Sequence, residues 1–586
     1  MKLAQVNELM ERGILISPDI FIEDINTDVI PSEHREGPVV LNKTFYQLYS
    51  KKNRQEFNWL EFERAIALKE KGRSSKTYDT FLNLVHYEEN PRTRKELDHL
   101  LKDLKQETQQ QEKILEPTTL ITITPPPSLS SAKPLVSPSE PIITPPLVTL
   151  TKKVNNLELA PLIITKTFKE DVKKRDATDF TQHFRNRYDN LKKFLSNRVE
   201  LQEGLTSINK IKNKEEREEV AIIGIIYDKR LTKNEHIELT VEDVTGTAKV
   251  LIMKNRKDIY DKAKDLVLDQ VIGIKGTKGD SKKIPTIFAN ILLEPDVPKD
   301  HPLKQAPDEI YAAFISDVHV GSKKFLEQEF LGFIRWINME QGTPEEHEKI
   351  QKIKYLFVVG DLIDGVGVYP GQENELNIPD IEKQYERAGE LFDMIRKDIT
   401  IIVCPGQHDA IRNSEPQPPI SATYAPKMAA ITNLHLVGNP TYLTIASTPE
   451  FSGINVLMYH GASFHHFIDV VDSLRIGKAR DNPRLLMKFL LQKRHLAPSH
   501  AATVYVPSII DDPMVIDPLP DIFCCGDMHR SDISSYNNIT TINGSCWQAK
   551  TDFQEKTGNN PDFCRVPLVN LKTRAVEMLK FHPNDN

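Results

Sequence analysis

The spacing of apolar residues predicts helices at the start of the chain. Leu3, Val6 and Leu9 lie three residues apart, and apolar residues recur at helical spacing between 57 and 68. We therefore expect residues 1–86 to form a small helical interaction domain. The plainest interpretation of this domain is a protein contact without chemistry of its own.

The helical pattern is lost after residue 86. The stretch is first charged and Gln-rich, and nine of the 38 prolines then lie between Pro117 and Pro146. Proline fixes φ and removes a backbone donor, so such a segment cannot build a helix or sheet core. Residues 87–165 are therefore predicted to be a disordered, Pro-rich linker that acts as an extended tether.

A single amphipathic helix is predicted within residues 166–200. Ten Lys or Arg against five Asp or Glu lie between Lys166 and Arg198, so its polar face is basic. Such a face could follow the phosphates of a nucleic acid or could simply be solvated, and both interpretations stay open. The apolar face repeats every three or four residues, at Phe180, Phe184, Tyr188, Leu191 and Leu195.

Short alternating runs over residues 201–300 predict five strands, with a helical patch at about 256–266 between the third and the fourth. This order is typical of an OB-fold barrel, which binds single-stranded nucleic acid or a partner protein. Few aromatic residues are available for base stacking, which favours a role as a scaffold.

From residue 305 to 586 strands alternate with helices, and five strands each end in Asp or His beside Gly. Side chains two apart on a strand point the same way, so the first such pair presents a carboxylate and an imidazole together. Oxygen and nitrogen ligands of this kind suit a divalent metal. The residues that follow the five strands are Asp317 with His319, Asp361 with Asp364, Gln407 with His408, His460, and Asp527 with His529.

Composition and charge exclude only a few classes of protein. The 586 residues carry a net charge of -7, which argues against a uniformly basic nucleic-acid coat but not against local basic surfaces. The five cysteines form no Cys-x-x-Cys pair, so a zinc ribbon is not expected. Their odd number and irregular spacing suit a protein in the reducing cytoplasm. The start of the chain is not a signal peptide, and no stretch is apolar enough to span a bilayer. We expect a soluble, cytoplasmic protein with no membrane partner.

The series of strand ends resembles the calcineurin-like metallophosphoesterase superfamily, with its motifs Asp-x-His, Gly-Asp-x-x-Asp, Gly-Asn-His-Asp/Glu, a lone His and Gly-His-x-His. The resemblance implies a multidomain α+β protein whose phosphoesterase domain has four layers, α/β/β/α. It also implies two divalent metal ions, Mn or Mg, with Asp361 as the bridge between them. His408 would stabilise charge or protonate the leaving oxygen, and Asp364 would orient it. By position, Asp317, His319, Asp361 and His529 would hold one metal, and Asp361, Gln407, His460 and Asp527 the other.

Two positions depart from the superfamily pattern, and both belong to the second metal. Gln407 stands in place of Asn, which keeps an amide oxygen but adds a methylene. Asp527 stands in place of His, which exchanges a neutral nitrogen for an anionic oxygen and favours harder ions. His465 and His466, which follow His460, either replace lost ligands or line the groove and the surface.

The flanking loops resemble the small subunit of archaeal family D DNA polymerase over roughly residues 180–580. The resemblance implies a 3′–5′ exonuclease that proofreads for a separate large polymerase subunit and scaffolds it. DNA 3′ ends, and as a further candidate a sliding clamp, would be its other partners, at the nucleoid. A catalytically weakened structural subunit and a stand-alone phosphoesterase for small molecules are the alternatives. The loops are 364–372, 378–381, 384–385, 416–420, 494–498, 544–548 and 551–554.

Overall fold

The computed structural model describes residues 14–16, 39–41, 148–150, 153–154, 157–167, 174–280, 284–556 and 558–582. The chain divides into two units, Met1–Ile142 and Ile143–Asn586. In the first unit the described residues form two short parallel strands, β1 (Ile14–Ile16) and β2 (Val39–Leu41). The helices expected over 1–86 lie outside the described residues. All that follows concerns the second unit.

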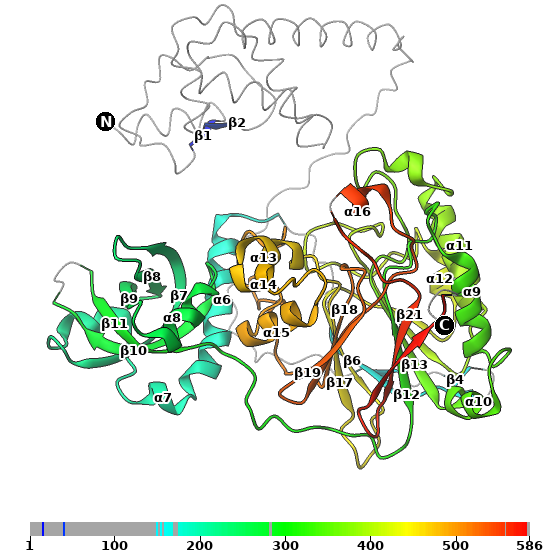
Figure 1. Cartoon of the computed structure of the whole chain (residues 1–586), viewed down its shortest axis with the longest axis horizontal. Coiled ribbons are helices and arrows are strands. Elements are labelled where there is room, and N and C mark those ends of the chain that lie inside the picture. The colour runs from blue at the N-terminus through cyan, green and yellow to red at the C-terminus, as the bar shows by residue number, and fades with distance from the viewer. Residues whose placement is uncertain are drawn as a thin grey trace, which may run out of the picture. The chain divides into compact units, whose positions relative to one another are not determined.

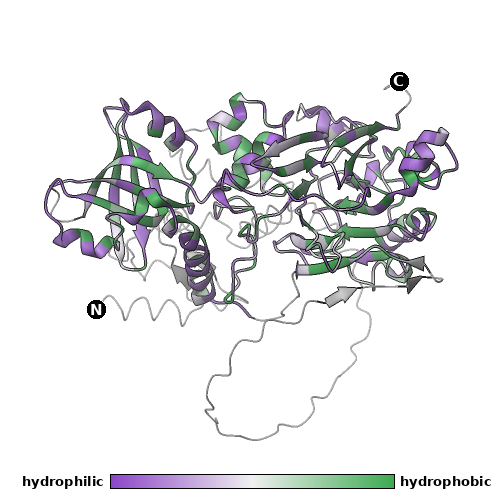
Figure 2. Cartoon of the chain, turned by 90° about the horizontal axis from the view of Figure 1, so that it is seen from below, coloured by the Kyte–Doolittle hydropathy of each residue, from purple (hydrophilic) through white to green (hydrophobic). Residues whose placement is uncertain are grey.

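Five strands close into a barrel, and a helix lies between the third and the fourth strand, as predicted. Along β8 the side chains of Ile237, Leu239 and Val241 point into the barrel and alternate with more exposed residues. In Figure 2 hydrophobic and hydrophilic residues are mixed along the strands of the barrel. The elements are β7 (Glu219–Leu231), β8 (Ile237–Asp243), β9 (Gly246–Ile252), α8 (Lys257–Lys264), β10 (Val271–Lys278) and β11 (Thr286–Leu293).

The predicted amphipathic helix is α6 (Ala177–Ser196), which begins at a capping box formed by Asp176 and Asp179. Tyr188, Leu191 and Leu195 are buried against the barrel. The basic face is not wholly solvated, because Arg187 is buried and paired with Asp512. Neither interpretation of the basic face, phosphate contact or solvation, therefore holds for Arg187. Two short helical segments follow, α7 (Val199–Gln202) and η4 (Ile208–Asn213).

Two sheets form the rest of the unit (Figure 1). Phe314 and Phe357 of the first sheet pack with Val456 and Ile542 of the second in one buried cluster, so the sheets face each other. The first has the order β15 (Leu434–Leu436), β14 (Thr400–Cys404), β13 (Ile353–Val359), β12 (Tyr311–Ile315), β21 (Arg565–Asn570), β22 (Val576–Lys580). The second has the order β19 (Asp532–Tyr536), β20 (Ile539–Asn543), β18 (Ile522–Cys525), β17 (Ile454–Met458), β16 (Thr441–Ile445), β6 (Leu162–Thr167), β3 (Val148–Leu150).

Helices cover the outer face of each sheet (Figure 1). Phe330 and Leu391 pack on Ile315 of the first sheet, and Phe464 and Leu490 are buried with strands of the second. The multidomain α+β fold with a closed five-stranded barrel is thus confirmed. The helices are α9 (Glu327–Ile337), α10 (Pro344–Gln351), α11 (Ile381–Asp393) and α12 (Pro426–Ala430) beside the first sheet, and α13 (Phe464–Val470), α14 (Asp472–Ile476) and α15 (Arg484–Lys493) beside the second. Smaller elements are β4 (Lys153–Val154), β5 (Leu157–Glu158), η5 (Gln372–Glu375) and α16 (Asp552–Lys556).

The prediction of a disordered linker over 87–165 is wrong for its last residues, from 148 onward. Strand β6 pairs antiparallel with β16, and β3 pairs with β6, so this part of the chain completes the second sheet. The partners of β6 lie 274 to 283 residues further along the chain. Sequence spacing carries no signal of such a pairing, and the neighbouring prolines masked the short apolar run. Among the helices of the described residues, none has the length and hydropathy of a membrane span.

Candidate metal centre

The loops at the carboxyl ends of five strands converge on one cavity of about 440 Å³. Strands β12, β13 and β14 come from the first sheet, and β17 and β18 from the second. Asp317 and His460 are fully buried at this place, beside the residues that line the cavity. The lining includes seven of the predicted site residues, namely His319, Asp361, Asp364, Gln407, His408, Asp527 and His529.

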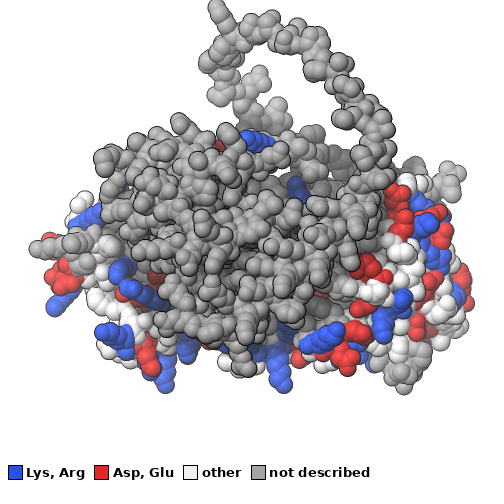
Figure 3. Space-filling view, turned by 90° about the horizontal axis from the view of Figure 1, so that it is seen from above, with Lys and Arg blue, Asp and Glu red and all other residues white. Residues whose placement is uncertain are grey.

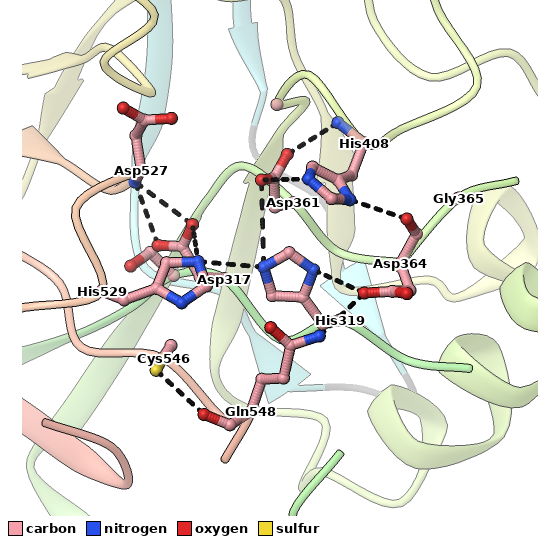
Figure 4. A network of polar contacts seen from close by, with 12 residues as sticks. Asp317, His319, Asp361, Asp364, Gly365, His408, Asp527, His529, Cys546 and Gln548 are labelled. Atoms are coloured by element: carbon pink, nitrogen blue, oxygen red, sulfur yellow. Dashed lines mark hydrogen bonds and ion pairs between the residues drawn. The ribbon is translucent and has the colours of Figure 1, made fainter. Parts of the chain in front are cut away.

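The side chains of Asp317, His319 and His529 form a compact group that could hold a metal ion (Figure 4). Nε2 of His319 lies 3.1 Å from Nε2 of His529, which in turn lies 3.4 Å from Oδ1 of Asp317. Ligands at about 2.0–2.2 Å from one ion stand roughly 3.0–3.5 Å from each other. The donor atoms of this group therefore have the separation of ligands to a common ion.

Asp361 lies beside this group and belongs to a second one, formed by Asp317, Asp361 and His460, so that Asp317 is common to both groups. Its Oδ2 lies 3.3 Å from Nε2 of His460 and 3.9 Å from Nε2 of His319. The carboxylate thus faces an imidazole on either side, which is the position expected for the bridging ligand of a two-metal site.

Polar contacts behind the imidazoles fix their orientation. Nδ1 of His460 donates to the carbonyl oxygen of Val359 at 3.0 Å, and Nδ1 of His319 lies 3.1 Å from the Asp364 carboxylate. These contacts leave both Nε2 atoms directed at the carboxylates, and Nε2 of His460 is buried without a hydrogen bond. Partners of this kind hold metal-binding histidines in the required tautomer.

The backbone is strained at the residues expected to be ligands. Asp317, His319, Asp361, Asp527 and His529 all have φ between 48° and 67°, the left-handed region that residues with a Cβ rarely adopt. Each such residue costs on the order of 1–3 kcal/mol, and such strain is typical of functional sites.

Glycines allow the close approach of these side chains. A Cβ on Gly406 would lie 2.1 Å from Oδ1 of Asp361, and one on Gly360 would lie 2.0 Å from Nδ1 of His460. Any other residue at either position would displace a candidate ligand, which explains why Gly stands beside these strand ends.

Among the described residues, the ion pairs of Asp317, Asp361 and Asp527 are all with histidines. Burial favours the neutral form of Asp361, but His460, His408 and His319 hold the pKa of its carboxyl well below the usual value. Burial likewise opposes the charge on His460, yet Asp361, Asp317 and Asp527 raise the pKa of that imidazole well above its usual range. Buried carboxylates need a compensating cation, which a divalent ion would supply in place of protons.

The second metal position contains both departures from the superfamily pattern, Gln407 and Asp527. Gln407 lines the cavity beside His408. Oδ2 of Asp527 is buried without a hydrogen bond, and burial raises the pKa of this carboxyl although His465 and His460 oppose the shift. His465 also lines the cavity, whereas His466 packs edge-on against the Phe467 ring.

The two expected catalytic residues lie together, but their contact runs through the main chain. Nδ1 of His408 donates to the carbonyl oxygen of Asp364 at 2.7 Å. The Asp364 carboxylate instead faces His319 and accepts hydrogen bonds from Gln548 at 2.9 Å and Gln372 at 3.2 Å.

Several supporting residues had no predicted role. Asp409 accepts from the backbone N–H groups of Leu362 and Gly406 and from the hydroxyl of Tyr385, so it ties two of the loops together. The amide of Gln554 lies 2.8 Å from Nδ1 of His529. Tyr385, Gln548 and Gln554 belong to loops that carry the family resemblance, and this resemblance was the signal in the sequence that could have identified them.

The sequence is similar to subunits of known DNA polymerases. A family model that describes the B subunit of DNA polymerases alpha and epsilon matches residues 312–534. The DNA polymerase II small subunit of Methanothermobacter thermautotrophicus is 36% identical over 419 residues, which cover 72% of this chain and 82% of that protein. Proteins of the same name from Halobacterium salinarum and Pyrococcus furiosus are 35% and 36% identical over 406 and 400 residues. These cover 69% and 68% of this chain, and 75% and 63% of the relatives.

Proposed function

This chain belongs to the family of archaeal DNA polymerase II small subunits, the small subunits of family D polymerases, and from this membership we propose that it is a metal-dependent 3′–5′ exonuclease. It would remove mismatched nucleotides for a large polymerase subunit that it also scaffolds. The observation that carries the proposal is the convergence of strand ends from two sheets, with donor atoms 3.1–3.4 Å apart, on one cavity.

The residues present fit a two-metal site of the calcineurin-like type. An unpartnered buried imidazole nitrogen and buried carboxylates without Lys or Arg partners among the described residues are what such ions would satisfy. When bound, two divalent ions, Mn or Mg, supply Lewis-acid activation of water and neutralise phosphate charge. Asp317, His319, Asp361 and His529 would hold one, and Asp361, Gln407, His460 and Asp527 the other.

His408 is placed to manage a proton at the leaving oxygen. Because its Nδ1 is held by the Asp364 carbonyl, its Nε2 faces the cavity and lies 4.0 Å from Oδ2 of Asp361. A proton on Nε2 would pass to the 3′ oxygen of the nucleotide left on the DNA. General acid catalysis of this kind contributes about 10²–10⁴ in rate.

Arg480 supports a phosphate-bearing substrate. It lines the same cavity, and among the described residues its guanidinium has no acidic partner. The cavity volume falls within the roughly 300–1,000 Å³ of ligand sites, which suits one terminal nucleotide. On the described part of the face in Figure 3, Lys and Arg are mixed with Asp and Glu. In this proposal the Arg480 guanidinium binds the substrate phosphate inside the cavity.

The rest of the chain fits a scaffold. The barrel over 201–300 and the phosphoesterase domain over 305–586, with the four-layer α/β/β/α arrangement, would together dock the large subunit. The helical N-terminal domain, the part of the linker that precedes β3 and a sliding clamp remain part of the proposal.

The test is digestion of a 5′-labelled primer with a mismatched 3′ end by the purified chain in Mn²⁺. The wild type should shorten the primer from its 3′ end, and His408→Ala should reduce the rate constant by at least about 100-fold. His347→Ala, on exposed helix α10, is the matched control and should leave the rate unchanged. Digestion by His408→Ala at the wild-type rate would refute the role of the site.

The two departures favour a second candidate, a structural subunit whose metal site is catalytically weak. In that case Asp361→Asn would leave assembly with the large subunit intact and change no nuclease rate. A lower nuclease rate in the assembled Asp361→Asn complex would exclude this alternative.

A further inference from the structure

The carboxylate of Asp527 has one imidazole close to it that no motif of the family accounts for. Its buried Oδ2 makes no hydrogen bond and lies 3.4 Å from Nε2 of His465. Nε2 of His460 lies 3.9 Å from Oδ1 on the other side. Asp527 therefore stands between two imidazole nitrogens, although the family pattern would place a single imidazole at position 527 itself.

The chain holds His465 at this place through its neighbours. Helix α13 starts three residues after Gly461, and Phe464 and Phe467 are fully buried beneath the helix. These anchors direct His465 to the cavity, while His466 packs on Phe467 instead of lining the cavity. The His465 side chain is 45% exposed, so its ring is free to adjust.

We propose that His465 is a ligand of the second metal position and restores there the nitrogen donor that position 527 lacks. The inference rests on the proposed two-metal site. The distance of 3.4 Å to Asp527 has the separation of two ligands of one ion. Asp527 and His465 together thus replace the single His of the superfamily motif. The second metal position keeps an imidazole nitrogen and gains an anionic oxygen.

Mn²⁺ binding to the full-length protein, measured by calorimetry and by the paramagnetic resonance signal of a coupled Mn pair, tests this proposal. We expect two ions in the wild type. His465→Ala should weaken the second ion at least about 10-fold, abolish the pair signal and leave the first ion unchanged. His466→Ala, one residue away on the same helix, should bind like the wild type.

A double variant separates ligation from a structural effect. In His465→Ala/Asp527→His the family imidazole returns, so second-ion affinity should recover relative to His465→Ala. If the wild type binds two ions and His465→Ala binds them as well as His466→Ala does, the proposed role of His465 is overturned but the two-metal site is not. Fewer than two ions in the wild type would overturn the two-metal site together with it.

Discussion

The buried ion pair between Arg187 and Asp512 should be a principal link between helix α6 and the domain that carries the candidate site. Nε of Arg187 donates to Oδ2 of Asp512 at 2.7 Å, and Nη1 donates to the carbonyl oxygen of Pro498 at 2.9 Å. The arginine is 3% exposed and the aspartate 0%. We predict that Arg187→Met strongly destabilises the protein.

The magnitude follows from the charge that the substitution leaves behind. Burial opposes the ionisation of Asp512, and His495 together with Arg187 holds the pKa of its carboxyl well below the usual value. His495 lies 2.9 Å from the same oxygen, and burial and then Arg187 lower its pKa to about 4. Loss of Arg187 removes the second cause but leaves the burial, so His495 replaces the lost cation only in part. Removal of one partner of a buried pair costs about 3–5 kcal/mol, and Met retains most of the apolar volume.

Urea unfolding of the full chain, with hydrogen exchange to localise the change, measures this loss. The free energy of unfolding should fall by about 3–5 kcal/mol, with faster exchange in α6 and in residues 494–517. Arg185→Met, on the exposed face of the same helix, is the control and should change stability by less than about 0.5 kcal/mol. Equal effects of the two substitutions would refute the importance of the ion pair.

Three further perturbations test other parts of the account. Burial raises the pKa of Glu415 to about 7 from an ordinary 4.5, so the folded state favours the protonated acid and loses stability as pH rises through this window. The difference in free energy of unfolding between Glu415→Gln and the wild type, measured with urea, should therefore change by about 3 kcal/mol in favour of the variant from pH 4.5 to pH 8. A difference that stays constant over this pH range would contradict this. Gly406→Ala should displace Asp361 and abolish Mn²⁺ binding in calorimetry, whereas Gly332→Ala in α9, where a Cβ meets nothing closer than 3.9 Å, should bind normally. Removal of metal with a chelator should lower the melting temperature of the wild type but not that of Asp361→Asn, and equal shifts would show that the metal acts elsewhere.

The barrel and the strand-end residues could be predicted from the sequence because their signals are local. Ile237, Leu239 and Val241 alternate within a single strand. The candidate ligands follow five strands, and each of these strand ends contains a Gly, so five separate segments point to the same chemistry. Local alternation and local turns need no knowledge of distant partners.

The errors arose where a distant partner decides the outcome. Strand β6 is short and follows a proline-rich stretch, and only its pairing with β16 makes it part of a sheet. Arg187 looks like a surface residue until Asp512, 325 residues later, is placed against it. The orientation of His465 towards Asp527 likewise depends on the packing of α13, which no spacing in the sequence reveals.

The most direct test of the central claim is the rate of nucleotide release from a 3′-labelled primer as Mn²⁺ is added to the purified chain. The two-metal account predicts no release without metal, a rate that rises as the second equivalent binds, and loss to background in Asp361→Asn. Release that is independent of metal, or that persists in Asp361→Asn, would contradict it.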